Sequence, residues 1–123
     1  MKRYIAEPDS RSVRETMARA DAWFICRVGY VETVRAAGLA AGRAAADAVR
    51  AEWPAFAVVE VDQGLVEDAA ALAVEHDLRS LDAIHLAAAL ILPADDLILA
   101  TWDRRLHAAA RAAGLHLLPA ALA

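Results

Sequence analysis

Apolar residues along the chain follow two kinds of pattern, short continuous runs and repeats of three or four positions. The short runs are typical of buried strands and cover residues 22–28, 56–61, 97–101 and 115–118. The repeats, together with turn residues and the expected caps Asp62 and Asp103, predict helices at about residues 10–20, 30–41, 43–52, 62–76, 80–92 and 103–114. Strands that alternate with helices indicate an α/β sandwich with a parallel sheet, whose ligand sites lie at the carboxyl ends of strands. Residues 1–6 fit neither pattern and are expected to form a tail.

The predicted helix at residues 80–92 is apolar nearly all round, which indicates burial on several sides. Ser80 is its expected N-cap, and Pro93 follows as the expected stop. One carboxylate, Asp82, lies in its first turn. Because a buried charge without a partner is costly, we expect the helix dipole or a metal ion to stabilise Asp82.

Composition narrows the class of protein. A hydrophobic fraction of 59% excludes disorder, yet no apolar run reaches the ~18 residues of a membrane span. The N-terminus lacks the apolar segment of a signal peptide, and the single cysteine, Cys26, excludes a disulfide framework. We therefore expect a cytoplasmic protein without a membrane partner. The net charge of −4 argues against coating of DNA but permits an enzyme that cuts RNA at a local site.

Three carboxylates lie in apolar or junction contexts instead of on charged faces. Glu32 stands early in a helix just after the first apolar run, Asp82 in the apolar helix, and Asp103 directly after the run at residues 97–101. Each acid alone is equally explained as a helix cap or a first-turn acid. If the three converge at one end of the sheet, a bound cation is favoured, because two carboxylates about 4 Å apart repel by about 4 kcal/mol at an effective dielectric constant of 20. Oxygen ligands select Mg²⁺ or Mn²⁺, which suit phosphodiester hydrolysis.

Other chemical motifs are missing from the sequence. It contains no G-x-S-x-G, P-loop or G-x-G-x-x-G, which excludes serine hydrolases, P-loop nucleotidases and dinucleotide-binding enzymes. His85 shares a helical face with Asp82 and is best explained as a core histidine. His76, His107 and His116 have no zinc-ligand spacing.

Segments along nearly the whole chain resemble PIN-domain ribonucleases of the VapC toxin type. They read YIAEPDS at 4–10, VE at 31–32, SLDAIHLA at 80–87 and ATWDRRL at 100–106, in the right order and spacing. The resemblance implies a PIN-like three-layer α/β/α sandwich with a central parallel sheet, as one domain over residues 1–123. It implies endoribonuclease cleavage of structured RNA, often tRNA or rRNA, at an acidic site that holds Mg²⁺ or Mn²⁺. It also implies a small antitoxin partner whose tail covers the site, and a homodimer or a toxin–antitoxin hetero-oligomer.

Carried over residue by residue, the resemblance assigns roles to the three acids. Glu32, Asp82 and Asp103 match acidic positions of the family's site. We expect Asp82 and Asp103 to hold the metal, with Glu32 as a further ligand or as the base for the attacking water.

The segment around Asp103 adds candidates for substrate binding. Thr101 matches a polar position next to the family's site. Arg104 and Arg105 are expected to contact phosphate, although a solvent-exposed helix start explains two arginines equally well.

The sequence departs from the family at its start, Met1-Lys2-Arg3-Tyr4. Family members open with an apolar strand that lies in the middle of the sheet and ends in a metal-ligand aspartate. Loss of this strand would leave about four or five apolar side chains unburied, at ~1.5–3 kcal/mol each, against ~5–15 kcal/mol for the stability of a domain. We therefore expect the start of the gene product to lie upstream. An in-frame upstream segment encoding an apolar strand and Leu-Asp would support this, and a stop codon immediately upstream would contradict it.

Two other functions compete with a ribonuclease. A non-catalytic PIN-like module would only bind an antitoxin or dimerise, and RNA cleavage by the chain and by Asp82→Asn in Mn²⁺ separates it from an enzyme. A phosphoacceptor signalling domain also uses acids at strand ends. It needs a lysine beside the acidic pocket at a later strand end, which Lys2, the only lysine, cannot supply.

Overall fold

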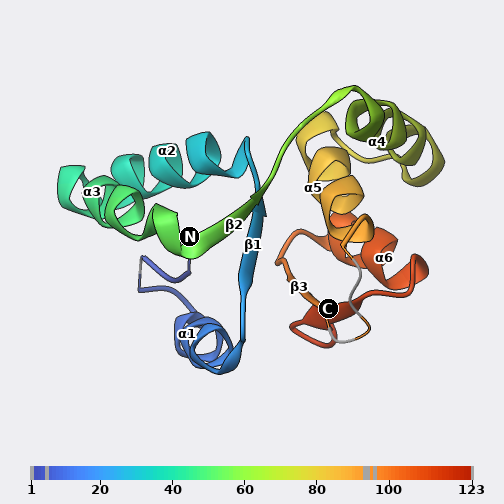
Figure 1. Ribbon diagram of the computed structural model, residues 1–123. Helices are drawn as coiled ribbons and strands as arrows, with labels where there is room; N and C mark the ends of the chain where they lie inside the picture. The colour runs from blue at the N-terminus through green and yellow to red at the C-terminus, as the bar shows by residue number, and fades with distance from the viewer. Residues whose placement is uncertain (1, 5, 93–94, 96, 123) are drawn as a thin grey trace. The chain divides into compact units, whose positions relative to one another are not determined.

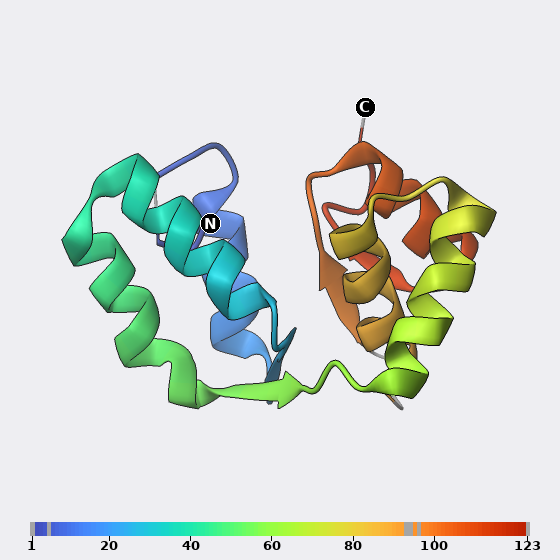
Figure 2. The same cartoon turned by 90° about the horizontal axis from the view of Figure 1, so that it is seen from above.

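The structure is a computed structural model that describes residues 2–4, 6–92, 95 and 97–122. One or more helices separate each strand from the next (Figures 1 and 2). In chain order they are α1 (Ser10–Arg19), β1 (Trp23–Cys26), α2 (Gly29–Ala41), α3 (Arg43–Glu52), the short 3₁₀ helix η1 (Trp53–Ala55), β2 (Phe56–Val59), α4 (Gln63–His76), α5 (Ser80–Leu90), β3 (Ile98–Ala100), α6 (Arg104–Ala112) and β4 (His116–Leu118).

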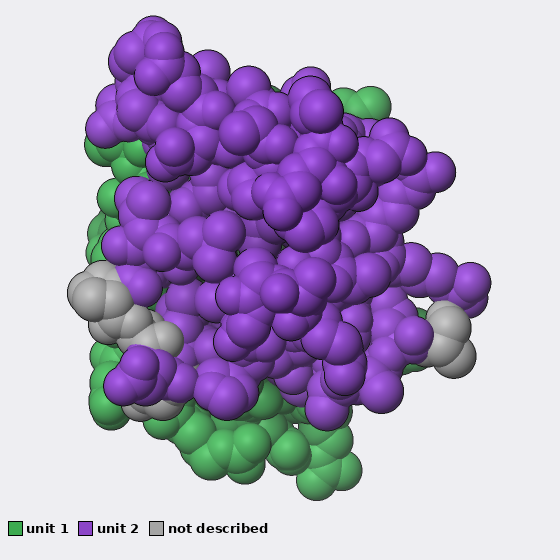
Figure 3. Space-filling model, turned by 90° about the vertical axis from the view of Figure 1, so that its right-hand side faces the viewer, with its two compact units in different colours: residues 1–60 green, residues 61–123 purple. Residues whose placement is uncertain are grey.

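The chain divides into two compact units, residues 1–60 (unit 1) and residues 61–123 (unit 2), coloured green and purple in Figure 3. Each unit holds one pair of parallel strands, β1 with β2 and β3 with β4. Helices connect the paired strands, as parallel pairing requires. The α/β class and the parallel pairing are confirmed, whereas one domain with a single central sheet stays a prediction.

In unit 1, aromatic side chains gather around the strand pair. The register places Trp23 opposite Phe56, and their ring centroids are 5.4 Å apart. Trp53 extends the group, with its ring 5.5 Å from that of Phe56 and 4.9 Å from that of Tyr30 in an edge-on arrangement. Offset and edge-on contacts of this kind stabilise a core beyond the area they bury. Beside them α2 and α3 pack against each other (Figure 2).

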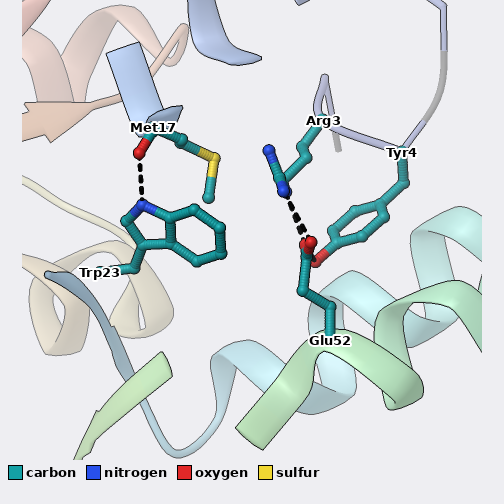
Figure 4. A network of polar contacts seen from close by, with 5 residues as sticks. All are labelled: Arg3, Tyr4, Met17, Trp23 and Glu52. Atoms are coloured by element: carbon teal, nitrogen blue, oxygen red, sulfur yellow. Dashed lines mark hydrogen bonds and ion pairs between the residues drawn. The ribbon is translucent and has the colours of Figure 1, made fainter. Parts of the chain in front are cut away.

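The first residues of unit 1 are not the tail that the sequence predicts. Arg3 forms a forked pair with the carboxylate of Glu52, with Nε 2.5 Å from Oε1 and Nη2 2.6 Å from Oε2 (Figure 4). The hydroxyl of Tyr4 also donates to Oε1 of Glu52 at 2.6 Å. The Arg3 guanidinium carbon lies 4.6 Å from the centroid of the Trp23 ring, within the range of a cation–π contact. These contacts join residues 3 and 4 to the end of α3 and to β1.

In unit 2, α5 packs against α4 and α6. Its buried residues are Ala83, Leu86, Ala87, Ala88 and Ala89, which confirms that the helix is buried on several sides. Leu81 and Leu90 are exposed, so the burial is incomplete. In the part of the chain that the structure describes, no helix is both long and apolar enough to cross a membrane.

The helix starts of unit 2 confirm two predicted caps and correct a third. Asp62 and Asp103 each accept a hydrogen bond from the backbone three residues on, at the starts of α4 and α6. Ser80 is not the N-cap of α5 but its first residue. The preceding Arg79 is extended and is the N-cap, with no side-chain capping bond. The helix therefore begins one residue earlier than a serine cap would place it, and the expected stop at Pro93 lies outside the described residues.

Candidate active site

Asp103 lies where β3 passes into α6, at the carboxyl end of the strand. Its Oδ1 accepts a hydrogen bond of 2.9 Å from the backbone N–H of Leu106. Its own N–H donates to Oγ1 of Thr101 at 3.2 Å, and the N–H of Thr101 donates to the carbonyl of Leu118 on β4. The backbone of Asp103 and its half-buried carboxylate are thereby each held by a hydrogen bond, and capping uses only one of the two carboxylate oxygens.

Asp82 is the third residue of α5 and belongs to its first turn. The side chain is half-buried, next to the fully buried Ala83 and one turn before the fully buried Leu86. Unpaired N–H groups at a helix start stabilise negative charge there. Because α5 and α6 contact each other, Asp82 and Asp103 stand at the starts of two packed helices of one unit.

Glu32 belongs to unit 1 and lies in the first turn of α2, which begins three residues after β1 ends. The side chain is half-buried. Val28 is the N-cap of α2 and offers no capping side chain, so Glu32 is the acid that complements this helix start. Its position after β1 is the one that the sequence predicts.

The donor chemistry of these acids fits a hard divalent cation. Among the described residues, no group of three or more His, Cys, Asp or Glu side chains is arranged to hold a metal ion. Unit 2 alone supplies two carboxylates, Asp82 and Asp103, and one oxygen of Asp103 lies outside its capping bond. One or two carboxylates with several retained waters are the usual ligand set of Mg²⁺. The roles of all three acids as metal ligands stay a prediction.

The three predicted substrate-binding residues have different surroundings. Thr101 is half-buried and supports the backbone of Asp103 through its hydroxyl. Arg104 is exposed at the first position of α6. Arg105 is also exposed, but its Nη1 lies 3.3 Å from Oδ2 of Asp77. Arg105 is thus part of an ion pair that the sequence did not predict.

Asp77, the partner of Arg105, was missed by sequence reasoning. It is the C-cap of α4 and adopts a left-handed backbone conformation, with φ 50° and ψ 52°. Together with His76 and Arg105 it borders a surface hollow of unit 2 floored by alanines of α6. The pair joins residues 28 positions apart, so no local sequence signal announces it.

Within the described part of the chain, the histidines belong to no group arranged to hold a metal ion. His107 is buried, and its Nε2 lies 2.8 Å from the carbonyl oxygen of Pro119, which makes it a hydrogen-bonded core residue. His85 is half-buried on α5, three residues after Asp82.

Comparison with known proteins gives the family. The family model described as PIN domain matches residues 4–112, a range that contains all three acids. The chain is similar to two proteins of Mycobacterium tuberculosis, Ribonuclease VapC45 of strain CDC 1551 / Oshkosh and Ribonuclease VapC49 of strain ATCC 25618 / H37Rv. Each is 43% identical over 112 residues, which cover 83% of this chain and 77% of the relative. No solved structure matches the chain significantly. The chain therefore belongs to the PIN-domain family, within the group of VapC ribonucleases.

Proposed function

We propose that the protein is an endoribonuclease that requires Mg²⁺ or Mn²⁺ and hydrolyses phosphodiester bonds in structured RNA of the tRNA or rRNA class. The observation that carries the proposal is the PIN-domain match over residues 4–112, which includes Glu32, Asp82 and Asp103. Two relatives at 43% identity are named ribonucleases, which supports the same activity.

In this proposal Asp82 and Asp103 hold the cation, and Glu32 is a further ligand or takes the proton of the attacking water. When bound, the ion supplies an activated water and stabilisation of the leaving oxygen. Each acid stands in the first turn or at the cap of a helix, where the helix dipole favours a carboxylate. Asp103 is oriented by two hydrogen bonds, one between Thr101 and its backbone N–H and one from Leu106 to its side chain.

Arg104 is the proposed phosphate contact. It directly follows Asp103 and is exposed, so RNA can reach its guanidinium. A guanidinium binds phosphate with two parallel hydrogen bonds, which orients the backbone as well as attracting it.

The proposal extends to the biological setting, a cytoplasmic toxin of a type II toxin–antitoxin system. The partner is a cognate antitoxin, in a toxin–antitoxin hetero-oligomer or with the toxin as a homodimer. Light scattering of the chain alone and with its antitoxin measures which assembly forms.

Cleavage of total tRNA and ribosomal RNA by the full chain, with and without Mn²⁺, tests the activity. We expect cleavage that stops when Mn²⁺ is chelated and falls at least about a hundredfold in Asp82→Asn, because one carboxylate ligand becomes neutral. The matched control is Asp68→Asn on the exposed face of α4 in the same unit, which should cleave like the unchanged chain.

Equal cleavage by the unchanged chain and by Asp82→Asn would contradict the proposal, since the activity would then come from elsewhere. No cleavage by either, combined with intact antitoxin binding, would favour a non-catalytic interaction module.

A further inference from the structure

An ion pair joins the turn between α4 and α5 to the first turn of α6. Nη1 of Arg105 lies 3.3 Å from Oδ2 of Asp77 and 3.4 Å from the backbone carbonyl oxygen of the same residue. One guanidinium nitrogen therefore holds both the side chain and the backbone of Asp77. The contact therefore does more than bring two opposite charges together. It also restrains the position of the turn relative to α6.

The backbone of Asp77 shows that this turn is held in an uncommon conformation. Its φ of 50° falls in the left-handed region, which residues other than glycine adopt at a cost. Such positions persist where their surroundings hold them. The N–H groups of Asp77 and Leu78 both donate to the carbonyl of Ala73, as at many helix ends. The guanidinium of Arg105 adds a restraint from a distant part of the chain.

The two ends of this pair lie close in sequence to the two acids of unit 2. Asp77 precedes Asp82 by five residues, and Arg105 follows Asp103 by two. The helices α5 and α6 that carry the acids also contact each other. The pair thus connects the lead-in to one acid with the helix that the other acid caps.

We infer that the Asp77–Arg105 pair is a brace that sets the spacing of Asp82 and Asp103, and that Arg105 is a positioning residue and not a phosphate ligand. The inference rests on the proposed metal-binding role of these two acids. Metal affinity depends steeply on the geometry of the ligands, since loss of the hydrogen bonds that orient the ligands weakens metal binding. A weak, exposed ion pair can therefore affect metal binding.

Electrostatics separate this role from direct RNA contact. The side chain of Asp77 is 93% exposed and that of Arg105 is 64% exposed, so a phosphate that approaches Arg105 also meets a negative carboxylate. Arg104 stands next to Arg105 on α6 and, among the described residues, has no such acidic partner. The two adjacent arginines therefore have different tasks.

Mn²⁺ binding without RNA tests the brace. The full chain, Asp77→Asn, Arg105→Gln and the double variant are titrated with Mn²⁺ and followed by electron paramagnetic resonance. Asparagine tolerates the left-handed backbone as well as aspartate does, so the fold is kept. We expect each single variant to raise the Mn²⁺ dissociation constant by about two- to fivefold, the range of an exposed ion pair, and the double variant to raise it no further.

RNA cleavage by the same variants gives a second readout. A brace predicts a lower kcat with little change in KM for both single variants, and partial rescue by Arg105→Lys. A phosphate ligand predicts the opposite pattern. Arg105→Gln would raise KM, while Asp77→Asn would lower KM because it removes the competing carboxylate.

Controls keep the outcomes distinct. Arg11→Gln breaks an exposed Arg11–Glu15 pair within α1, far in sequence from the acids of unit 2, and should leave Mn²⁺ binding unchanged. Native Mn²⁺ affinity in Asp77→Asn and Arg105→Gln, with binding lost in Asp82→Asn, would overturn the brace and leave the proposed function standing. Absence of Mn²⁺ binding by the unchanged chain would overturn both, and additive losses in the double variant would overturn the brace alone.

Discussion

Arg3 connects the start of the chain to the end of α3 and to β1. Its guanidinium bonds both oxygens of Glu52 and covers the face of Trp23, and the side chains of the pair are only 22% and 27% exposed. Hydrogen bonds from Arg3 lower the pKa of Glu52 below its usual value of 4.5. Burial and the bond to Glu52 raise the pKa of Tyr4. Arg3 and Tyr4 therefore stabilise the ionised form of Glu52.

This arrangement predicts a pH-dependent stability for unit 1. Because the pKa of Glu52 is lower in the folded chain than in the unfolded one, its contribution is present above pH 4.5 and is lost as the pH falls below it. Replacement Glu52→Gln should cost about 1–2 kcal/mol of unfolding free energy at pH 7. The cost should shrink towards pH 3, as urea unfolding at a series of pH values will measure.

Glu15→Gln, in the exposed pair with Arg11, is the matched control and should show a smaller cost at every pH. A cost of Glu52→Gln that stays constant from pH 7 to pH 3 would contradict the charge-based account.

Single residues also show where sequence reasoning succeeds and where it fails. The caps of Asp62 and Asp103 follow from a local rule, an aspartate just before a helix, and both are confirmed. The partner of Arg3, Glu52, is 49 residues away, and no short-range pattern encodes such a pair. The same holds for the pair of Arg105 with Asp77, which joins residues 28 positions apart.

At the scale of elements, α4 and α6 start in the same way but in different surroundings. Asp62 and Asp103 each cap with Oδ1 at 2.9 Å from a backbone N–H. Asp62 is exposed, whereas Asp103 is half-buried at the end of β3 and is a proposed metal ligand. The two helix starts therefore allow capping to be separated from metal binding within one unit.

The comparison predicts different outcomes for asparagine and alanine. Asparagine caps a helix about as well as aspartate. The variant Asp103→Asn should therefore unfold at nearly the same urea concentration as the unchanged chain, yet lose Mn²⁺-dependent cleavage. Asp103→Ala should lose cleavage and also about 1 kcal/mol of unfolding free energy. Asp62→Ala should show a similar loss of stability with cleavage intact. Full cleavage by Asp103→Asn would remove this acid from the proposed site.

Apolar patterns predict which helices and strands form better than they predict where each one begins and ends. The apolar run at residues 22–28 contains β1, but the strand covers only Trp23–Cys26, where residues pair with β2. Apolar residues indicate which segments are buried, whereas the limits of a strand depend on where its partner strand ends. Parallel pairing followed from the alternation of helices and strands, and the choice of partner strand did not, because it depends on contacts between distant segments.

The charge of the whole molecule limits how it can bind RNA. A net charge of −4 repels a polyanion at long range, so attraction must come from a local group of cations. Of the thirteen basic residues several are held by acids, among them Arg3, Arg11, Arg27 and Arg105. We therefore expect few contacts between the protein and RNA phosphates. Their number can be measured from the dependence of RNA binding or cleavage on salt concentration.

Salt dependence therefore tests Arg104 as a phosphate ligand. For RNA cleavage by the full chain, kcat/KM should fall as monovalent salt rises, and the slope of log kcat/KM against log salt should be shallow. Arg104→Gln should raise KM with kcat nearly unchanged and reduce that slope by about 0.7–0.9, the contribution of one phosphate contact. Arg43→Gln on α3, an exposed arginine paired with Asp47, should leave both the slope and KM unchanged. An unchanged slope in Arg104→Gln would mean that RNA is held by other residues, and a fall in kcat alone would mean that Arg104 acts on the acidic site and not on the substrate.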